Sequence, residues 1–252
     1  MLHQKTVNFK PEYSSIANTR IANTGIASIG KGSNALHLSL ALLASSALSV
    51  MTAGSAHADQ GDFQLRLRGI IVAPTEESSA VLPSFPDAEV GVTNGFSPEI
   101  DLSYFITNNI AAELIAATTA HDIVGEGSLA GLEIAETMVL PPTLTFQYHF
   151  TPNGPIRPYV GVGVNFTAFY STDSTDALNN AIGTTDTDLD NSFGVAFQAG
   201  VDIPINDRWF VNADVKYIDI DTTATLTTGN LVNTVDVNLD PIVAGIGIGV
   251  RF

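Results

Sequence analysis

The sequence predicts an all-β protein, an eight-stranded antiparallel up-and-down transmembrane β-barrel. Three observations carry this prediction. Apolar residues recur at every second position through eight segments, which is the period of a β-strand. The links between these segments are alternately short and long, as in outer-membrane barrels, where short turns face the periplasm and longer loops face outside. The chain also ends on such a segment, with Phe252 as its last residue.

The N-terminal part has the features of a secretory leader. Lys31 precedes a short apolar run over residues 36–50, and Ala56-His57-Ala58 follows it. A basic flank, a short apolar run and small residues before the cleavage point predict a signal peptide with an extended n-region over residues 1–58, cut between Ala58 and Asp59. The run is shorter than the ~20 apolar residues that a spanning helix needs. Residues 59–252 then form the barrel.

The first four predicted strands are residues 63–71, 96–104, 110–116 and 140–150. In each, one face is apolar and the other holds polar or charged side chains, which predicts strands with two different environments. The link 107–109 is short, and the links 74–95 and 119–137 are long. The apolar faces consist of Phe63, Leu65, Leu67 and Ile71, then Phe96, Ile100, Leu102 and Tyr104, then Ile110, Ala112, Leu114 and Ala116, and finally Leu140, Pro142, Leu144, Phe146, Tyr148 and Phe150.

The last four predicted strands are residues 158–168, 193–203, 209–217 and 242–252. Turn-forming residues occupy the short links 151–155 and 204–207. The long links 171–190 and 222–234 are rich in Gly, Ser, Thr and acidic residues, as the other long links are, so all four are expected to be solvated loops. The apolar faces include Val160, Val162, Val164 and Phe166, then Phe193, Val195 and Phe197, then Trp209, Val211 and Val215, and finally Ile242, Ile246, Ile248, Val250 and Phe252.

Alternation alone does not distinguish a membrane barrel from a soluble sandwich, which can also wet its polar face. The composition favours the membrane, because only 14% of the residues are charged, against ~25% in soluble domains. In lipid, every backbone polar group must be paired, and closed barrels satisfy this requirement. The net charge of -16 argues against a nucleic-acid partner, and the absence of cysteine excludes disulfides and thiol catalysis.

The predicted mature chain resembles the outer membrane protein W family along essentially its whole length. The resemblance implies an eight-stranded outer-membrane barrel that passes small hydrophobic molecules across the outer membrane. It also suggests a lumen that opens sideways into the bilayer. The segments that carry the resemblance are Val72-Ala73-Pro74-Thr75-Glu76, residues 107–118, Leu140-Pro141-Pro142-Thr143-Leu144, residues 157–165, residues 217–224 and Leu239-Asp240-Pro241.

Parity along the strands predicts which side chains point into the lumen. Glu113, Ile115, Asp214 and Lys216 are the candidate transport residues, with Ile115 as an apolar constriction. Eight strands leave room only for side chains or one small ligand. The alternative is that Glu113, Asp214 and Lys216, together with Arg66, form a buried charge network that plugs the barrel. Lys216 also differs from the apolar residue expected there in the family.

Two prolines interrupt an apolar strand at Leu140-Pro141-Pro142-Thr143. Proline removes a ladder donor and is normally found at strand edges or bulges. One interpretation is a lateral opening beside these four residues. The other is a bulge that only bends the strand.

Several further motifs are weaker. His121, near Thr119, Asp122 and Ser128, could belong to an outer-leaflet lipid-modifying site, but a solvated loop histidine is the simpler interpretation. His149 is expected at the periplasmic end. Asp186-x-Asp188-x-Asp190 lacks the glycine and glutamate of a calcium loop and predicts an acidic surface loop. The glycines at 161 and 163, and at 245, 247 and 249, alternate within strands and are expected to make room in the lumen.

We therefore expect a conduit for small hydrophobic molecules in the bacterial outer membrane, with lateral release into the bilayer. The alternative is a structural or receptor-like surface barrel with a plugged lumen and acidic binding loops. No enzymatic activity, cofactor or metal is predicted. The expected partners are outer-membrane lipid and lipopolysaccharide, the small hydrophobic solute, and the barrel-assembly machinery, which would recognise the C-terminal strand ending at Phe252.

Overall fold

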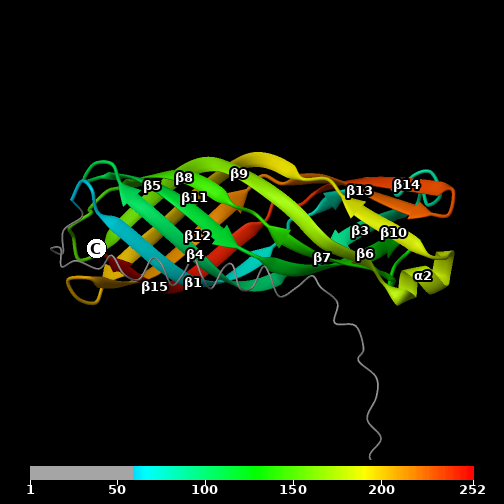
Figure 1. The fold of residues 1–252 in the computed structure, drawn as a ribbon, viewed down its shortest axis with the longest axis horizontal. Helices are drawn as coiled ribbons and strands as arrows, with labels where there is room; N and C mark the ends of the chain where they lie inside the picture. Colours follow the sequence, from blue (N-terminus) through cyan, green and yellow to red (C-terminus); the bar gives the residue numbers. More distant parts are fainter. Residues whose placement is uncertain (1–58) are drawn as a thin grey trace, which may run out of the picture. The chain divides into compact units, whose positions relative to one another are not determined.

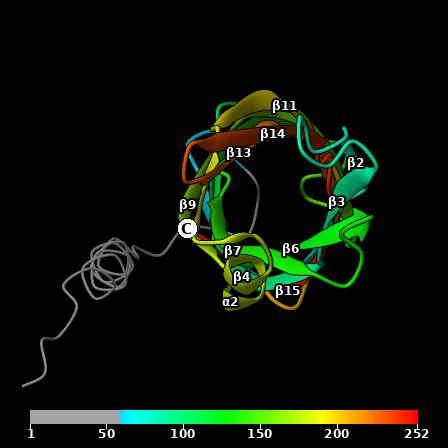
Figure 2. The same ribbon diagram turned by 90° about the vertical axis from the view of Figure 1, so that its right-hand side faces the viewer.

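The computed structural model describes residues 59–252, which form a closed antiparallel barrel (Figure 1). The predicted leader, including Ala58, lies outside the described residues. Each barrel strand pairs with the next, and the last pairs with the first, so that the strands form a ring when viewed along the barrel (Figure 2). The eight strands are β1 (Phe63–Ala73), β4 (Gly95–Phe105), β5 (Ile110–Ala117), β8 (Thr143–His149), β9 (Arg157–Ser174), β11 (Ser192–Pro204), β12 (Trp209–Ile218) and β15 (Ile242–Arg251).

The alternation predicted from the sequence is confirmed. In β4, Ser97, Glu99 and Asp101 are buried, whereas Phe96 is 75% exposed. The other barrel strands also present their large apolar side chains outward, for example Ile246 of β15. An apolar outer surface around a polar interior is the arrangement that suits a hydrocarbon environment.

The long links are not solvated loops, and this prediction was wrong. Most of their residues form strands that continue the barrel beyond its eight-stranded part, at the right of Figure 1. Apolar residues alternate there only over short stretches, between many threonines and acidic residues. The composition of these links therefore suggested loops. The elements are β2 (Glu77–Ser78), β3 (Ala88–Val92), β6 (Thr119–Gly127), β7 (Glu133–Leu140), α2 (Asp176–Ile182), β10 (Thr185–Leu189), β13 (Asp221–Thr228) and β14 (Leu231–Asn238).

The two halves of the barrel have opposite polarity. In the extension, Ile123, Leu226 and Val235 are buried inside, and polar residues such as Thr234 and Asp236 face outward. In the eight-stranded part, the polar side chains are inside. Burying apolar groups inward is favourable wherever water surrounds the strands. The polarity change therefore marks where the barrel leaves the membrane.

The orientation follows from the links. The short turns between β4 and β5, β8 and β9, and β11 and β12 lie at the end of the barrel that also holds the C-terminus (Figure 1). In outer-membrane barrels this end faces the periplasm. The extension is then extracellular. Within residues 59–252, no helix is long and apolar enough to cross a membrane.

A glycine on β9 sets how closely two strands approach. A Cβ at Gly163 would collide with the carbonyl oxygen of Leu144 and lie 2.7 Å from Thr145 Cα. Gly163→Val is therefore expected to lower the free energy of unfolding of the barrel by about 1–3 kcal/mol or more. The folded fraction can be measured from the electrophoretic mobility of unheated samples. Ala199→Val, on the exposed face of β11, is the control; equal folded fractions for the two variants would contradict the prediction.

Candidate transport site

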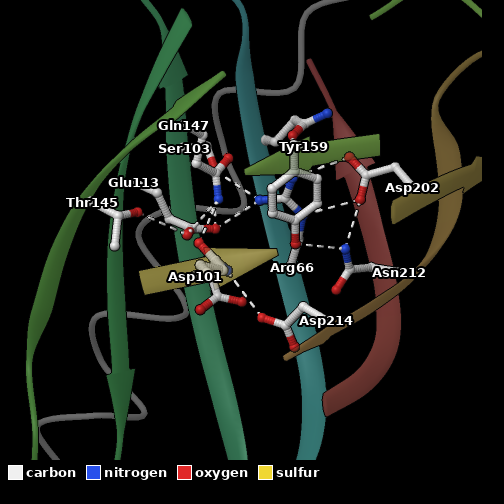
Figure 3. A network of polar contacts seen from close by, with 12 residues as sticks. Arg66, Asp101, Ser103, Glu113, Thr145, Gln147, Tyr159, Asp202, Asn212 and Asp214 are labelled. Carbon is white, nitrogen blue, oxygen red and sulfur yellow. Dashed lines mark hydrogen bonds and ion pairs between the residues drawn. The ribbon is translucent and has the colours of Figure 1, made fainter. Parts of the chain in front are cut away.

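A buried ion network crosses the lumen of the eight-stranded part, and Arg66 of β1 is one of its centres (Figure 3). Its guanidinium is completely buried and pairs with Glu113 of β5 at 2.8 Å and with Asp202 of β11 at 3.1 Å. It also donates to Ser103 Oγ and to Gln64 Oε1. Strands far apart in the sequence are thus joined through one side chain.

Arg68, two residues further along β1 on the same face, forms the second centre. It lies 2.6 Å from carboxylate oxygens of Asp101 and of Asp214, and 2.9 Å from Glu99. Lys216 contacts Glu99 at 2.7 Å and Asp214 at 3.0 Å. All these groups are at most 3% exposed in their side chains. Buried charges need such pairing, because an isolated charge in a low-dielectric interior is very costly.

Neutral polar residues complete the network. Gln147 Nε2 donates to Glu113 Oε2 at 2.6 Å and to Gln198 Oε1 at 3.0 Å, and Thr145 donates to the same Glu113 oxygen. Asn212 donates to Asp202 and to the Tyr159 hydroxyl. The lumen at this level is filled with hydrogen-bonded side chains, as expected for eight strands.

The structure places Glu113, Asp214 and Lys216 together with Arg66 in this one network. The candidates named from the sequence did not include Glu99 and Asp202. Both occupy inward positions on their strands, and parity was the signal that could have found them. The arginine or lysine with which Glu99 or Asp202 forms an ion pair is decided only when the barrel closes.

Above the network lies an apolar hollow that is partly open to solvent. Glu99 and Lys216 line its lower end, beside Ile115 and Thr143. Ile115 is 3% exposed and points inward next to this polar floor. The apolar lining comes mainly from the extension and includes Val72, Val90, Ile123, Ile134, Val139, Phe169, Ile218, Leu226, Val235, Val237, Leu239 and Val243.

The two prolines separate β7 from β8. On one side, β5 pairs with β8 as far as Ile115 and Thr143, and β6 pairs with β7 from Thr119 and Val139 onward. No ladder pairing is formed on this side between those two points. On the other side, β9 stays close, because Phe166 N donates to Pro142 O at 3.1 Å. The interruption is therefore one-sided.

Side chains at this interruption connect it to the hollow. Pro141 and Thr143 line the hollow, whereas Leu140 and Pro142 are half-buried and do not. Opposite them, the Thr118 hydroxyl lies 2.6 Å from the Tyr170 hydroxyl of β9, and Thr118 O accepts from Ser97 Oγ. The Thr118–Tyr170 contact therefore spans the interruption, from the β5–β6 side to β9.

The histidines differ from the expectation in one case. His121 is not a solvated loop residue: it is 5% exposed in β6 and lines the hollow. Its Nδ1 faces Thr93 O at 2.7 Å and therefore carries the proton, while Nε2 lies 2.9 Å from Thr119 Oγ1. The simpler interpretation failed because the link is a strand. His149 lies near the periplasmic end, stacked on Tyr159.

The acidic motifs lie outside the lumen. Asp186 and Asp188 are exposed on strand β10, not in a loop. Asp219, Asp221 and Asp240 form a second acidic group. Burial, followed by the charges of Asp219 and Asp240, raises the pKa of Asp221. Both carboxylate oxygens of Asp240 already accept hydrogen bonds, from the Tyr217 hydroxyl and from Ile220 N. This group organises the connection between β12 and β13.

Taken together, the closed barrel, its apolar outer belt and its polar lumen define an outer-membrane β-barrel protein. The model of the OmpW family matches residues 59–252, and the chain belongs to this family. The family resemblance and the outer-membrane location predicted from the sequence are thereby confirmed.

Individual relatives agree with this assignment. The chain is 39% identical over 212 residues to outer membrane protein W of Salmonella typhimurium, covering 83% of this chain and 98% of the relative. It is 28% identical over 169 residues to the dibenzothiophene metabolism operon protein PahQ of Pseudomonas aeruginosa, covering 66% and 76%. The crystal structure of the outer membrane protein OprG from Pseudomonas aeruginosa is similar, with a TM-score of 0.74 and 30% identity, covering 79% of this chain and 99% of OprG.

Proposed function

We propose that this protein takes small hydrophobic molecules from outside the cell and releases them sideways into the outer membrane. The observation that carries the proposal is the position of the apolar hollow. Its lower end is closed by the ion network, and its wall includes Pro141, where strand pairing is interrupted. An apolar solute would gain nothing by crossing buried charges, whereas lipid next to the interruption is a favourable destination.

The lipopolysaccharide leaflet is a polar barrier for such a solute. The extension carries the hollow beyond the apolar belt, so a molecule would enter without dissolving in that leaflet. Support from relatives comes through the family and through PahQ, whose name places it in an operon of dibenzothiophene metabolism. A compact aromatic heterocycle of that kind matches the apolar lining. Solute class and lateral release are both parts of this proposal.

The Thr118–Tyr170 contact gives a sharp test of lateral release. In Tyr170→Phe the ring remains and the hydroxyl bond across the interruption is lost. We expect about a two- to tenfold faster transfer of an apolar fluorescent solute into the lipid of proteoliposomes, because one hydrogen bond contributes about 0.5–1.5 kcal/mol. The change should appear in the transfer rate, while the folded fraction stays as in the native protein.

Tyr104→Phe is the matched control, since Tyr104 faces outward at the periplasmic end of β4. Transfer by the native protein no faster than through protein-free vesicles would contradict the conduit. If the native protein transfers solute and Tyr170→Phe has the same transfer rate, the site of release proposed here would be contradicted, but the conduit would not.

The alternative is a surface barrel with a permanently plugged lumen and acidic binding surfaces. The seven ion-pair contacts in the described lumen favour it. It predicts no solute transfer in the same assay. For assembly, we propose that the machinery recognises the final strand. Phe252 pairs with Phe63 through hydrogen bonds in both directions, so the end of the chain is paired with the start of β1.

A further inference from the structure

Arg251, the last residue of β15, is a buried cation without a counterion. It is 3% exposed, and none of its three guanidinium nitrogens has a hydrogen-bond partner. Within residues 59–252, no carboxylate forms an ion pair with it, whereas Arg66 and Arg68 each have at least two. Its guanidinium lies over the Phe105 ring at 5.1 Å. A cation–π contact alone does not offset the cost of burying an unpaired charge.

A second arginine, Arg157 at the start of β9, lies at the same periplasmic end of the barrel. It is 8% exposed, and its Nε donates to Gly154 O at 3.1 Å. Two buried like charges at one end of the lumen repel each other, and an anion there would be attracted to both.

Unused hydrogen-bond capacity surrounds the same place. Gln64 faces Arg251 across the β1–β15 ladder, is fully buried, and its Nε2 has no partner. Buried donors are nearly always satisfied in native proteins. Unsatisfied donors on both Arg251 and the facing Gln64 indicate a ligand that accepts hydrogen bonds.

The two nearby carboxylates, Asp202 and Asp62, form no ion pair with Arg251. Asp202 is held by Arg66 and by Asn212 Nδ2 at 2.8 Å. Asp62 accepts from Asp59 N and makes no ion pair with either arginine. The side chain of Arg251 faces the lumen, since it contacts Phe105 and lies opposite inward-pointing Gln64. Headgroups of the surrounding lipid lie outside the barrel and therefore do not reach the Arg251 guanidinium.

We propose that the periplasmic end of the lumen binds a small oxyanion, of the phosphate or sulfate type, through Arg251, Arg157 and Gln64. A planar guanidinium presents two parallel N–H groups that match two oxygens of such an anion. The anion enters from the periplasm, neutralises both cations and completes the polar layer below the ion network. This inference does not depend on passage of hydrophobic solutes.

The test is urea unfolding of the purified protein in detergent micelles, with chloride exchanged for inorganic phosphate at constant pH and ionic strength. A ligand that binds only the folded state raises the unfolding midpoint as its concentration increases. We expect this rise in the native protein and its loss in Arg251→Gln. Arg208→Gln is the matched control, since Arg208 is an exposed arginine at the same end of the barrel; it should respond as the native protein does.

In chloride, Arg251→Gln should be at least as stable as the native protein, because the substitution removes an unpaired buried charge. A large loss of stability in chloride would instead assign Arg251 to packing on Phe105. An equal phosphate response in Arg251→Gln, or its loss in Arg208→Gln, would show a general salt effect and overturn the proposal.

Titration calorimetry with phosphate keeps the proposal testable if Arg251→Gln does not fold. The native protein should bind one phosphate, and Arg157→Gln should bind it at least about tenfold more weakly. Absence of binding to the native protein at about 10 mM phosphate, a concentration well above a millimolar dissociation constant, would overturn the site.

Discussion

Arg66→Met is expected to destabilise the folded barrel by about 3–5 kcal/mol, the effect of removing one partner from a buried ion pair. Methionine is of similar length and fills the space, but it leaves Glu113 and Asp202 without their cation. It also removes the donors that Ser103 and Gln64 accept from. The loss should appear as a lower urea midpoint, followed by the fluorescence of Trp209, the single tryptophan.

Two further variants separate charge from packing. Arg208→Met removes an exposed arginine at the periplasmic end and should change stability by no more than about 0.5 kcal/mol. Adding Glu113→Gln and Asp202→Asn to Arg66→Met removes the unpaired charges and should recover part of the loss. A loss below about 1 kcal/mol in Arg66→Met would show that the network contributes little to the fold.

Ile115→Trp is expected to reduce transfer of an apolar solute about tenfold, which corresponds to about 1.4 kcal/mol on the barrier. Ile115 lies on the floor of the hollow, beside the interruption at Pro141. An indole there would occupy the space through which a solute turns toward the lipid. The measurement is the initial transfer rate in proteoliposomes with equal amounts of folded protein.

Leu114→Trp is the control for this prediction. Leu114 is the neighbouring residue on β5, is 53% exposed and faces the lipid. The same side chain is thus introduced one position away on the opposite face. Equal transfer rates for the two variants would mean that solute does not pass Ile115, even if the protein remains a conduit.

The sequence predicted much of the membrane part because strand alternation is a local property. Residues 96–104 and 242–252, for example, carry their apolar side chains at every second position, and the structure shows β4 and β15 there. The extracellular links were misjudged. Their alternation is present, as in the inward Thr222, Ala224 and Leu226 of β13, but it is carried by small and polar residues. The prediction of solvated loops gave more weight to this polar composition than to the two-residue period.

The sequence by itself determined the strands and the face on which each side chain lies, because a strand turns successive residues to opposite sides whatever its neighbours are. Only the tertiary structure decided which inward groups meet. Arg66 reaches Glu113 across 47 residues and Asp202 across 136, and these contacts exist only after the barrel closes. The polarity change between the two halves and the unpaired Arg251 were decided in the same way. Pairing of charges depends on distances across the lumen, which no local pattern contains.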